Sequence, residues 1–206
     1  MPVEKLTDVV GFETHNGIRI PVYGVIQSVD DQVRSYLKIY KERENFTKTK
    51  SWARPTKEAI EAIVKYSPIV EMGAGLGYWA KLISKAGGDI ICFDAFPNKL
   101  GINHFHSSSV NPYYEIKMGF PEDLCFHSNR TLFLCWPPYD NPMASDCLTH
   151  YKGSTVIYIG EGDGGCTADD NFHETLYKDF EEIECIFIPQ WDGIHDSLTI
   201  YKRKNQ

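Results

Sequence analysis

A glycine-rich turn between two apolar runs is the feature that most constrains the fold of this chain. Residues 69–72 lead into the turn 73–77, and a segment with helical spacing, 78–86, follows directly. A second apolar run, 90–93, then ends at Asp94. Glycines let the backbone turn sharply and approach a ligand closely, and an acid at the end of the second strand is placed to accept hydrogen bonds from ribose hydroxyls. The layout predicts a strand–turn–helix–strand unit that binds a nucleotide.

Two kinds of ligand compete for this turn. A dinucleotide site has the pattern G-x-G-x-x-G and needs a small residue where helix and strand pack closely. Here Gly73, Gly75 and Gly77 alternate, and the bulky Trp79 follows them. Glu71 would repel a phosphate, whereas it suits a ligand with a positive charge. S-adenosylmethionine (SAM) carries an ammonium and a sulfonium group and no phosphate, so the turn favours SAM, with an NAD(P)-dependent oxidoreductase as an alternative.

The segment 71–77 resembles the first motif of the class I SAM-dependent methyltransferases, and Asp94 is similar to the ribose-binding acid of their second strand. The resemblance covers roughly residues 52–204. It implies a three-layer, Rossmann-like α/β fold with a mostly parallel sheet. It also implies that the glycine turn holds SAM, with Glu71 near the amino acid moiety and Asp94 on the ribose.

The order of apolar and amphipathic segments favours the same α/β fold. Strands are expected at 69–72, 90–94, 132–136, 155–160, 184–188 and 197–202, helices at 30–44, 56–66, 78–86, 142–150 and 170–181, and either strand or loop at 113–118. Alternating strands and helices predict a parallel sheet covered on both faces. The last two strands are joined by 189–196, which is too short for a crossover helix, so they should form an antiparallel hairpin at the sheet edge.

The N-terminal part reads as an addition to this domain. Residues 1–28 are expected to form an irregular or short-stranded arm, with turn signals at 16–17 and at Pro21. We therefore divide the chain into an N-terminal arm and helix, 1–50, and a SAM-binding domain, 51–206.

A second unusual stretch, Trp136-Pro137-Pro138-Tyr139, follows a buried strand. Ligands of open α/β sheets bind beyond the carboxyl ends of the strands, and two prolines make a stiff loop there. The stretch resembles the Asp/Asn-Pro-Pro-Tyr/Phe motif of methyltransferases that act on amino groups of adenine, cytosine or glutamine. Trp136 replaces the acceptor residue of that motif, and indole only donates. The expectation is a planar substrate stacked on Tyr139 rather than N6-adenine chemistry; a rigid structural turn is the alternative.

Three more residues are candidates for the same cleft. Glu161 lies in an acidic, glycine-rich loop after the strand 155–160, where it could receive a hydroxyl or amine or act as a base; a solvated turn is the alternative. Trp52 and Arg54 precede a helix and could close over the cofactor, with Arg54 paired to its carboxylate. A role at the helix entry competes with this interpretation. Asp140 is a weaker candidate base.

No metal site is expected. His104 and His106 form a single H-x-H without cysteine or acidic partners. The six cysteines are scattered and include no C-x-x-C pair, which indicates reduced thiols in the cytoplasm or nucleus.

Composition narrows the class of partner. With 42% hydrophobic and 24% charged residues the chain is expected to be soluble and globular, and no apolar stretch approaches the ~20 residues that span a bilayer. A net charge of −7 argues against long nucleic acid as a substrate, because phosphate contacts dominate such binding. The basic cluster 38–50 is interpreted as a solvated helix face.

These observations predict an enzyme that transfers a methyl group from SAM to an acceptor of open class: a small molecule, a nucleobase or a protein side chain. A catalytically inactive SAM-binding partner or sensor is the alternative that Trp136 motivates. The oligomeric state is left open.

Overall fold

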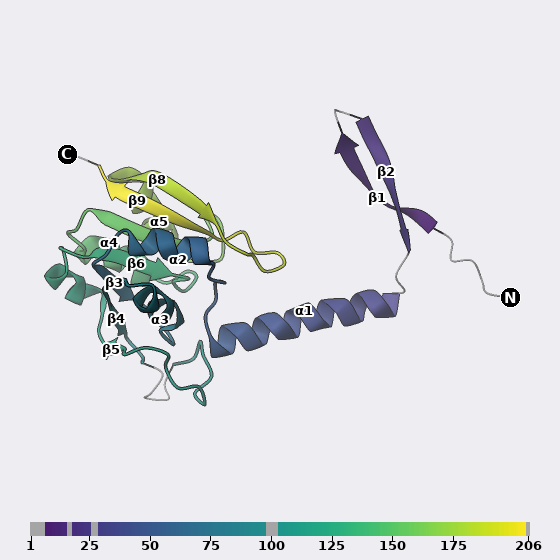
Figure 1. Ribbon diagram of the computed structural model, residues 1–206. Helices are drawn as coiled ribbons and strands as arrows, with labels where there is room; N and C mark the ends of the chain where they lie inside the picture. Colours follow the sequence, from purple (N-terminus) through teal and green to yellow (C-terminus); the bar gives the residue numbers. More distant parts are fainter. Residues whose placement is uncertain (1–6, 16–17, 26–28, 98–102, 205–206) are drawn as a thin grey trace. The chain divides into compact units, whose positions relative to one another are not determined.

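The computed structural model describes residues 7–15, 18–25, 29–97 and 103–204 (Figure 1). The chain forms two compact units, Met1–Glu44 and Asn45–Gln206. The first unit contains the strands β1 (Thr7–His15) and β2 (Ile18–Val25) and most of the helix α1 (Val29–Thr49). The strands β1 and β2 pair in antiparallel fashion as a two-stranded sheet.

The predicted turn at Pro21 is wrong, because Pro21 lies inside β2 and faces Phe12 of β1. In a two-stranded sheet each strand is an edge, so a residue without an N–H is tolerated there. The other predicted turn, at residues 16–17, lies outside the described residues.

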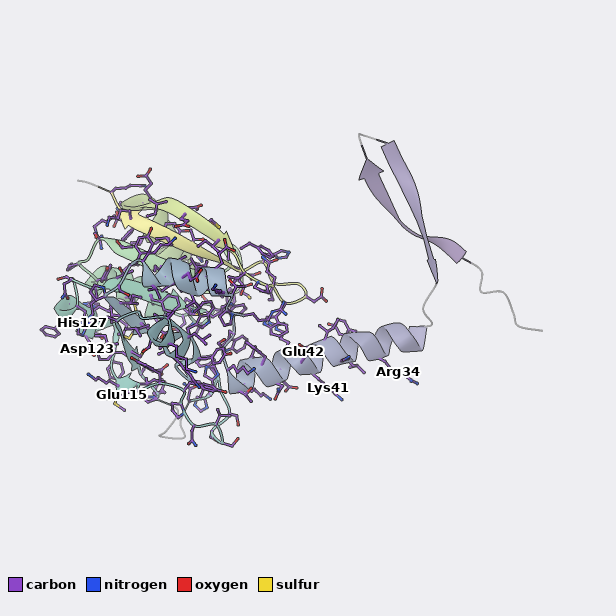
Figure 2. The ribbon with its side chains drawn as sticks, in the orientation of Figure 1. Arg34, Lys41, Glu42, Glu115, Asp123 and His127 are labelled. Carbon is purple, nitrogen blue, oxygen red and sulfur yellow. The ribbon has the colours of Figure 1, made fainter. Side chains whose placement is uncertain are left out.

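The helix α1 extends beyond the predicted end at residue 44. Its charged side chains Arg34, Lys41 and Glu42 are exposed (Figure 2). Its last turn belongs to the second unit, where Thr47 is buried and the Phe46 ring contacts aromatic rings of that unit. Contacts of this last turn with other residues of the second unit stabilise the helix beyond residue 44. The spacing of apolar residues does not indicate these contacts.

The second unit is built on a seven-stranded sheet in the order β5-β4-β3-β6-β7-β9-β8. The strands are β3 (Ile69–Met72), β4 (Ile90–Asp94), β5 (Lys117–Met118), β6 (Thr131–Cys135), β7 (Thr155–Gly160), β8 (Phe180–Phe187) and β9 (Ser197–Arg203). The first five of these pair in parallel, and β9 runs antiparallel to both of its neighbours. The predicted mostly parallel sheet with an antiparallel C-terminal hairpin is confirmed.

Helices cover both faces of this sheet. They are α2 (Lys57–Val64), α3 (Tyr78–Lys85), α4 (Met143–His150) and α5 (Asp170–Asp179), with the 3₁₀ helix η2 (Pro121–Phe126). The side chain of Thr56 accepts a hydrogen bond from the Ala59 N–H and so caps α2.

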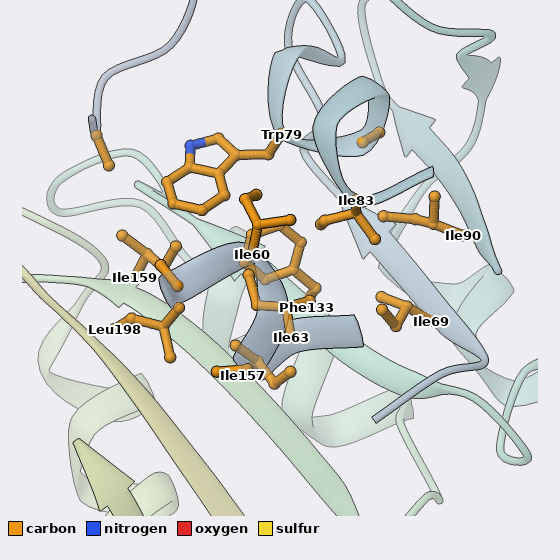
Figure 3. Close-up of a cluster of buried hydrophobic side chains, with 14 of the residues drawn as sticks. Ile60, Ile63, Ile69, Trp79, Ile83, Ile90, Phe133, Ile157, Ile159 and Leu198 are labelled. Carbon is orange, nitrogen blue, oxygen red and sulfur yellow. The ribbon is translucent and has the colours of Figure 1, made fainter. Parts of the chain in front are cut away.

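Two hydrophobic cores flank the sheet. In one core, residues of α2 and α3 such as Ile63 and Ile83 pack on Phe133 of β6 (Figure 3). In the other core, η2, α4 and α5 pack on the opposite face. Ile69 faces the first core and Val70 the second, because successive side chains of a strand point to opposite faces. Burial on both faces explains why β3 is apolar except for Glu71.

The boundary between α5 and β8 differs from the prediction. The helix ends at Asp179 and the strand begins at Phe180, not at residue 184. Glu181, Glu182 and Glu184 are exposed on this strand. Among the described strands, β8 pairs only with β9, and charged side chains are typical of such an edge. The glutamates interrupt the apolar pattern at residues 181–184, so the sequence does not indicate that the strand begins at Phe180.

No helix among the described residues is long and apolar enough to cross a membrane.

Candidate functional site

A cleft of about 840 Å³ lies at the carboxyl ends of β3, β4 and β6. From β3 the chain proceeds outward to β4 and β5 and then returns to β6 on the other side, so the strand order reverses at this cleft. Open α/β sheets bind ligands at such a point. Nine of the residues predicted for the site line the cleft, namely Trp52, Glu71, Gly73, Gly75, Asp94, Trp136, Pro137, Pro138 and Tyr139.

The glycine turn has the backbone that its sequence predicts. Gly73, Gly75 and Gly77 have φ values of 77°, 56° and 67°, in the left-handed region that favours glycine. The Asp94 carboxylate accepts hydrogen bonds from the Gly75 N–H at 2.8 Å and from the Phe96 N–H at 2.8 Å. Asp94 thereby holds the end of β4 against the turn.

Asp94 is buried beside the cleft, with 8% of its surface exposed. Burial raises the pKa of its carboxyl, while the two backbone hydrogen bonds and the nearby His106 oppose that rise. A carboxylate accepts about four hydrogen bonds in all, so Asp94 keeps acceptor capacity for hydroxyl groups of a ligand.

Glu71 is an acid buried beneath the cleft. Only 2% of its surface is exposed, and its Oε2 accepts a hydrogen bond from the Cys92 Sγ at 3.4 Å. Burial and the negative charge of Asp94 raise the pKa of Glu71 to about 8, against the opposing effect of the Cys92 thiol. At neutral pH the carboxyl is therefore largely neutral, and a cation in the cleft would favour its ionised form.

Lys50 lines the cleft, which the sequence does not predict. Its Nζ lies 5.0 Å from the ring centroid of Phe46 and 5.9 Å from that of Tyr78. It is the only lysine or arginine in the lining formed by the described residues. For Lys50, the interpretation as part of a solvated helix face is wrong, because the unexpected extension of α1 brings it to the cleft.

His106 stands over the glycine turn. Its Nδ1 lies 2.9 Å from the Thr47 carbonyl oxygen, and its Nε2 would clash with a Cβ added at Gly75. Burial lowers the pKa of the imidazole, while Thr47 and Asp94 oppose that shift. The single H-x-H pattern gives no signal for this contact with the turn.

Apolar residues line the part of the cleft near β4 and β5. Phe96, Phe120 and Pro121 contribute to this lining. The rings of Phe96 and Phe120 are about half exposed. Such a surface suits a flat, weakly polar ring. The sequence gives one signal that could have identified Phe96: it is an apolar residue that lies two positions after Asp94, at the end of a predicted strand.

Trp136 leaves the strand β6 with a φ of 54°. Its indole Nε1 donates a hydrogen bond to the Asp196 Oδ2 at 2.7 Å, and its ring stacks on Trp52 with centroids 5.3 Å apart. Asp196 is fully buried. The indole donor at the position where the similar motif has Asp or Asn thus has its own carboxylate partner on the β8–β9 loop. The two indoles form an aromatic wall of the cleft.

Arg54 does not line the cleft. Its guanidinium donates to the carbonyl oxygens of Pro189 and Gln190 and lies 4.3 Å from the ring centroid of Trp191. The Trp191 Nε1 donates in turn to the Trp52 carbonyl oxygen at 3.0 Å. These contacts replace the predicted pairing with a cofactor carboxylate, because they direct the charge of Arg54 to the β8–β9 loop.

Glu161 and Gly77 also lie outside the cleft lining. The Glu161 carboxylate accepts from the Cys166 N–H at 2.8 Å and from the His195 N–H at 2.7 Å. Burial raises the pKa of Glu161, but the hydrogen bonds from Cys166 and His195 outweigh this effect and bring the pKa below its ordinary value. Glu161 is consequently a weak base. Gly77 instead allows close packing, with the Tyr114 Cβ 2.9 Å from where its own Cβ would sit.

Within the described part of the chain, no three side chains of His, Cys, Asp or Glu converge on a site that could hold a metal ion.

Comparisons with known proteins find similarity of fold only. No protein-family model matches the chain, and no curated protein does. The structure of 1,6-didemethyltoxoflavin-N1-methyltransferase from Burkholderia thailandensis, with bound 1,6-didemethyltoxoflavin and S-adenosylhomocysteine, is 11% identical with a TM-score of 0.51, over 95% of this chain and 100% of that chain.

Two further structures match with lower scores. Magnesium protoporphyrin IX methyltransferase from Synechocystis is 8% identical with a TM-score of 0.44, over 88% of this chain and 100% of that chain. A TehB-like SAM-dependent methyltransferase from Corynebacterium glutamicum is 15% identical with a TM-score of 0.44, over 85% and 100%. The match to the Burkholderia enzyme, together with the strand order, shows that the chain has the Rossmann-like fold of class I methyltransferases.

Replacing Gly75 with alanine should destabilise the protein by about 1–3 kcal/mol, because the residue has a positive φ and its Cβ would clash with His106. Chemical unfolding measures the decrease in the free energy of unfolding. Gly193→Ala is the matched control, since Gly193 has a φ of 71° and no atom within 4 Å of its added Cβ. Equal losses in the two variants would show that His106 does not crowd the turn.

Replacing Glu71 with glutamine should change how stability depends on pH. Because the pKa of Glu71 is raised, between pH 4.5 and about 8 the native state keeps a proton that the unfolded state releases. The native protein is therefore progressively destabilised as the pH rises through this range. Glutamine does not titrate, so the free energy of unfolding of Glu71→Gln should rise relative to that of the original protein by a few kcal/mol over that pH range. The size follows because a tenfold difference in proton affinity between the native and unfolded states corresponds to about 1.4 kcal/mol. Unfolding followed at acid and alkaline pH measures this. The exposed Glu58→Gln is the control, and parallel curves for Glu71→Gln and the original protein would contradict the prediction.

Proposed function

We propose that this protein is a SAM-dependent methyltransferase that acts on an acceptor of a class the fold alone does not name. The observation that carries the proposal is the composition of the cleft where the strand order reverses. The described lining contains the carboxyl groups of Glu71, Asp94, Glu122 and Asp146 and one lysine, Lys50. That charge distribution suits a zwitterionic adenosyl ligand with an extra positive charge.

The residues present fit SAM at each of its parts. Phe96 and Phe120 would border the adenine, and Asp94 would accept hydrogen bonds from the ribose hydroxyls. Glu71 would face the amino group, which supplies the cation that a buried acid otherwise lacks. Lys50 takes the role that the sequence suggests for Arg54, and would pair with the carboxylate.

When bound, SAM supplies a methyl group on a sulfonium that an acceptor can displace in line. The chain contributes mainly by holding the reacting groups close and aligned. Trp136 and Trp52 form a rigid wall, and Pro137 and Pro138 fix the loop that follows. Glu161 is too weak a base to remove a proton from a poor nucleophile, so the enzyme would act on an acceptor that is nucleophilic without such help.

A nicotinamide cofactor fits the cleft less well. A dinucleotide carries a pyrophosphate, and one lysine among several carboxylates would not balance it. The alternative of an inactive SAM-binding protein rests on Trp136, and it predicts cofactor binding without methyl transfer to any acceptor.

Calorimetric titration with S-adenosylhomocysteine, run beside NADH, tests the cofactor assignment. We expect S-adenosylhomocysteine to bind and NADH not to bind. Asp94→Ala should weaken binding about 10- to 100-fold, since hydrogen bonds to a charged group contribute about 1.5–3 kcal/mol. Binding of NADH alone, or unchanged affinity in Asp94→Ala, would refute the assignment.

The role of Lys50 can be separated from the rest of the site by the choice of ligand. Lys50→Met should weaken binding of S-adenosylhomocysteine about tenfold, because the loss of one charged contact amounts to about 1.4 kcal/mol. It should leave binding of 5′-methylthioadenosine unchanged, because that ligand has no carboxylate. Lys57→Met is the control, since Lys57 is exposed and pairs with Glu61 outside the cleft. Equal losses for both ligands would mean that Lys50 only shapes the cleft.

A further inference from the structure

A second cavity, of about 550 Å³, adjoins the cofactor cleft. Its lining comprises Tyr139, Glu161, Gly162, Asp163, Gly164, Gly165, Cys166 and His195. Tyr139 and Cys166 line both spaces. A molecule in the second cavity would therefore lie beside the loop that follows β6, at the end of the cleft away from Phe96 and Phe120.

The cavity contains a fixed negative charge. The Glu161 side chain is 11% exposed, and each of its oxygens already accepts one backbone N–H. The Cys166 thiol donates a third hydrogen bond, and because a carboxylate can accept about four hydrogen bonds, one direction remains for a ligand. Those backbone hydrogen bonds also stabilise the ionised form of the carboxylate, so it stays charged at neutral pH.

The other charges in the cavity favour a cation. Asp163 adds a second carboxylate, and no lysine or arginine is found in the lining that the described residues form. The His195 Nδ1 lies 3.6 Å from the Glu161 Oε1, and its side chain is 82% exposed. An anionic molecule would meet net repulsion here, whereas a cation would be attracted.

Tyr139 offers an aromatic face at the same place. Its ring is 67% exposed and follows two prolines. The Asp140 N–H donates to the Ala168 carbonyl oxygen at 2.9 Å, and the Ala168 N–H donates to the Pro137 carbonyl oxygen at 3.1 Å, so hydrogen bonds hold the loop on both sides of the tyrosine. A positioned aromatic ring beside a carboxylate is suited to an ammonium group, which interacts with the ring face as well as with the charge.

We propose that this cavity is the acceptor subsite, and that the acceptor is a small organic amine whose ammonium group lies between the Tyr139 ring and the Glu161 carboxylate. The bound ammonium would release one proton to the solvent, and the free lone pair would then form the new nitrogen–methyl bond as the sulfonium–methyl bond of SAM breaks. S-adenosylhomocysteine would be the leaving group. The inference rests on the proposed function, because it takes the adjoining cleft as the site of the methyl donor. It narrows the acceptor classes to small cationic molecules and excludes nucleic acid.

Binding of three matched probes tests this inference on the full chain. The probes are phenethylamine, the neutral 2-phenylethanol and the anionic phenylacetate, titrated by calorimetry with and without saturating S-adenosylhomocysteine. We expect the amine to bind with a Kd of about 1 mM or tighter, and the alcohol and the acid to bind at least about tenfold more weakly. Equal binding of amine and alcohol, preference for the acid, or no binding of the amine up to about 10 mM would overturn the inference.

Variants of Tyr139 test whether the preference for the amine arises in this cavity. Tyr139→Phe keeps the ring and should keep the preference for the amine, whereas Tyr139→Leu should reduce amine binding about three- to tenfold, as expected for a cation–π contact of about 1 kcal/mol. Phe187→Leu is the control, because Phe187 is 72% exposed on β8 and lies outside both cavities. Equal affinity in all three variants would overturn the inference.

Glu161→Gln tests the charge and should remove the preference for amine over alcohol. Its thermal unfolding midpoint and its affinity for S-adenosylhomocysteine show whether the variant is folded, and the Tyr139 pair decides the question if it is not. Failure of S-adenosylhomocysteine to bind the original protein would refute the proposed function. Binding of S-adenosylhomocysteine without a preference for the amine would refute the acceptor subsite alone.

Discussion

The hydrogen bond that the Asp94 carboxylate accepts from the Gly75 N–H fixes the end of β4 against the glycine turn after β3, and the bond from the Phe96 N–H shapes the turn that follows β4. Asp94 can reach this turn because β3 and β4 pair in parallel, with Met72 opposite Phe93. The turn itself needs positive φ values, which only glycine adopts without strain. One short acid and three glycines therefore determine where a ligand can approach the sheet.

Glu71 shows that this arrangement has a cost in stability. Its side chain shares a face of the sheet with Ile69, so the alternation of β3 directs a carboxyl toward a hydrophobic core. The thiol of Cys92, opposite it in the parallel register, is the hydrogen-bond partner that the structure gives it. A buried acid with one long hydrogen bond from a thiol is a local conflict with stability, and such conflicts are expected at functional sites.

Much of the fold can be predicted because the signals are local. The strands at 69–72, 90–94 and 155–160 have the predicted bounds, since each is mostly apolar and mostly buried in the sheet. The short strand β5, Lys117–Met118, falls in a segment whose two exposed residues give no such signal, so the sequence leaves the choice between strand and loop open.

The parts of the site that escape prediction depend on contacts between distant residues. Arg54 binds a carbonyl 135 positions away in the sequence, and Trp136 binds Asp196 at a separation of 60. No spacing rule indicates such partners. The sequence suggests that Lys50 belongs to a solvated helix face, because the regular spacing of apolar residues in α1 stops before the helix itself ends. Charge and residue type suggest roles for these side chains, but tertiary packing decides which of them reaches the cleft.

The Trp136–Asp196 pair connects the departure from the related motif to the chemistry that the cleft can perform. In the related motif an Asp or Asn accepts a hydrogen bond from the target amino group, which helps a planar, weakly nucleophilic amine to react. Here the Asp196 carboxylate lies at the edge of the indole instead, and its Oδ2 accepts the hydrogen bond from the Trp136 N–H. The cleft gains an aromatic wall and loses a group that would polarise the acceptor. Under the proposed function, such a site suits an acceptor whose lone pair is reactive once its proton has left. The aliphatic amine that we propose for the second cavity meets that requirement, whereas the amino group of a nucleobase does not.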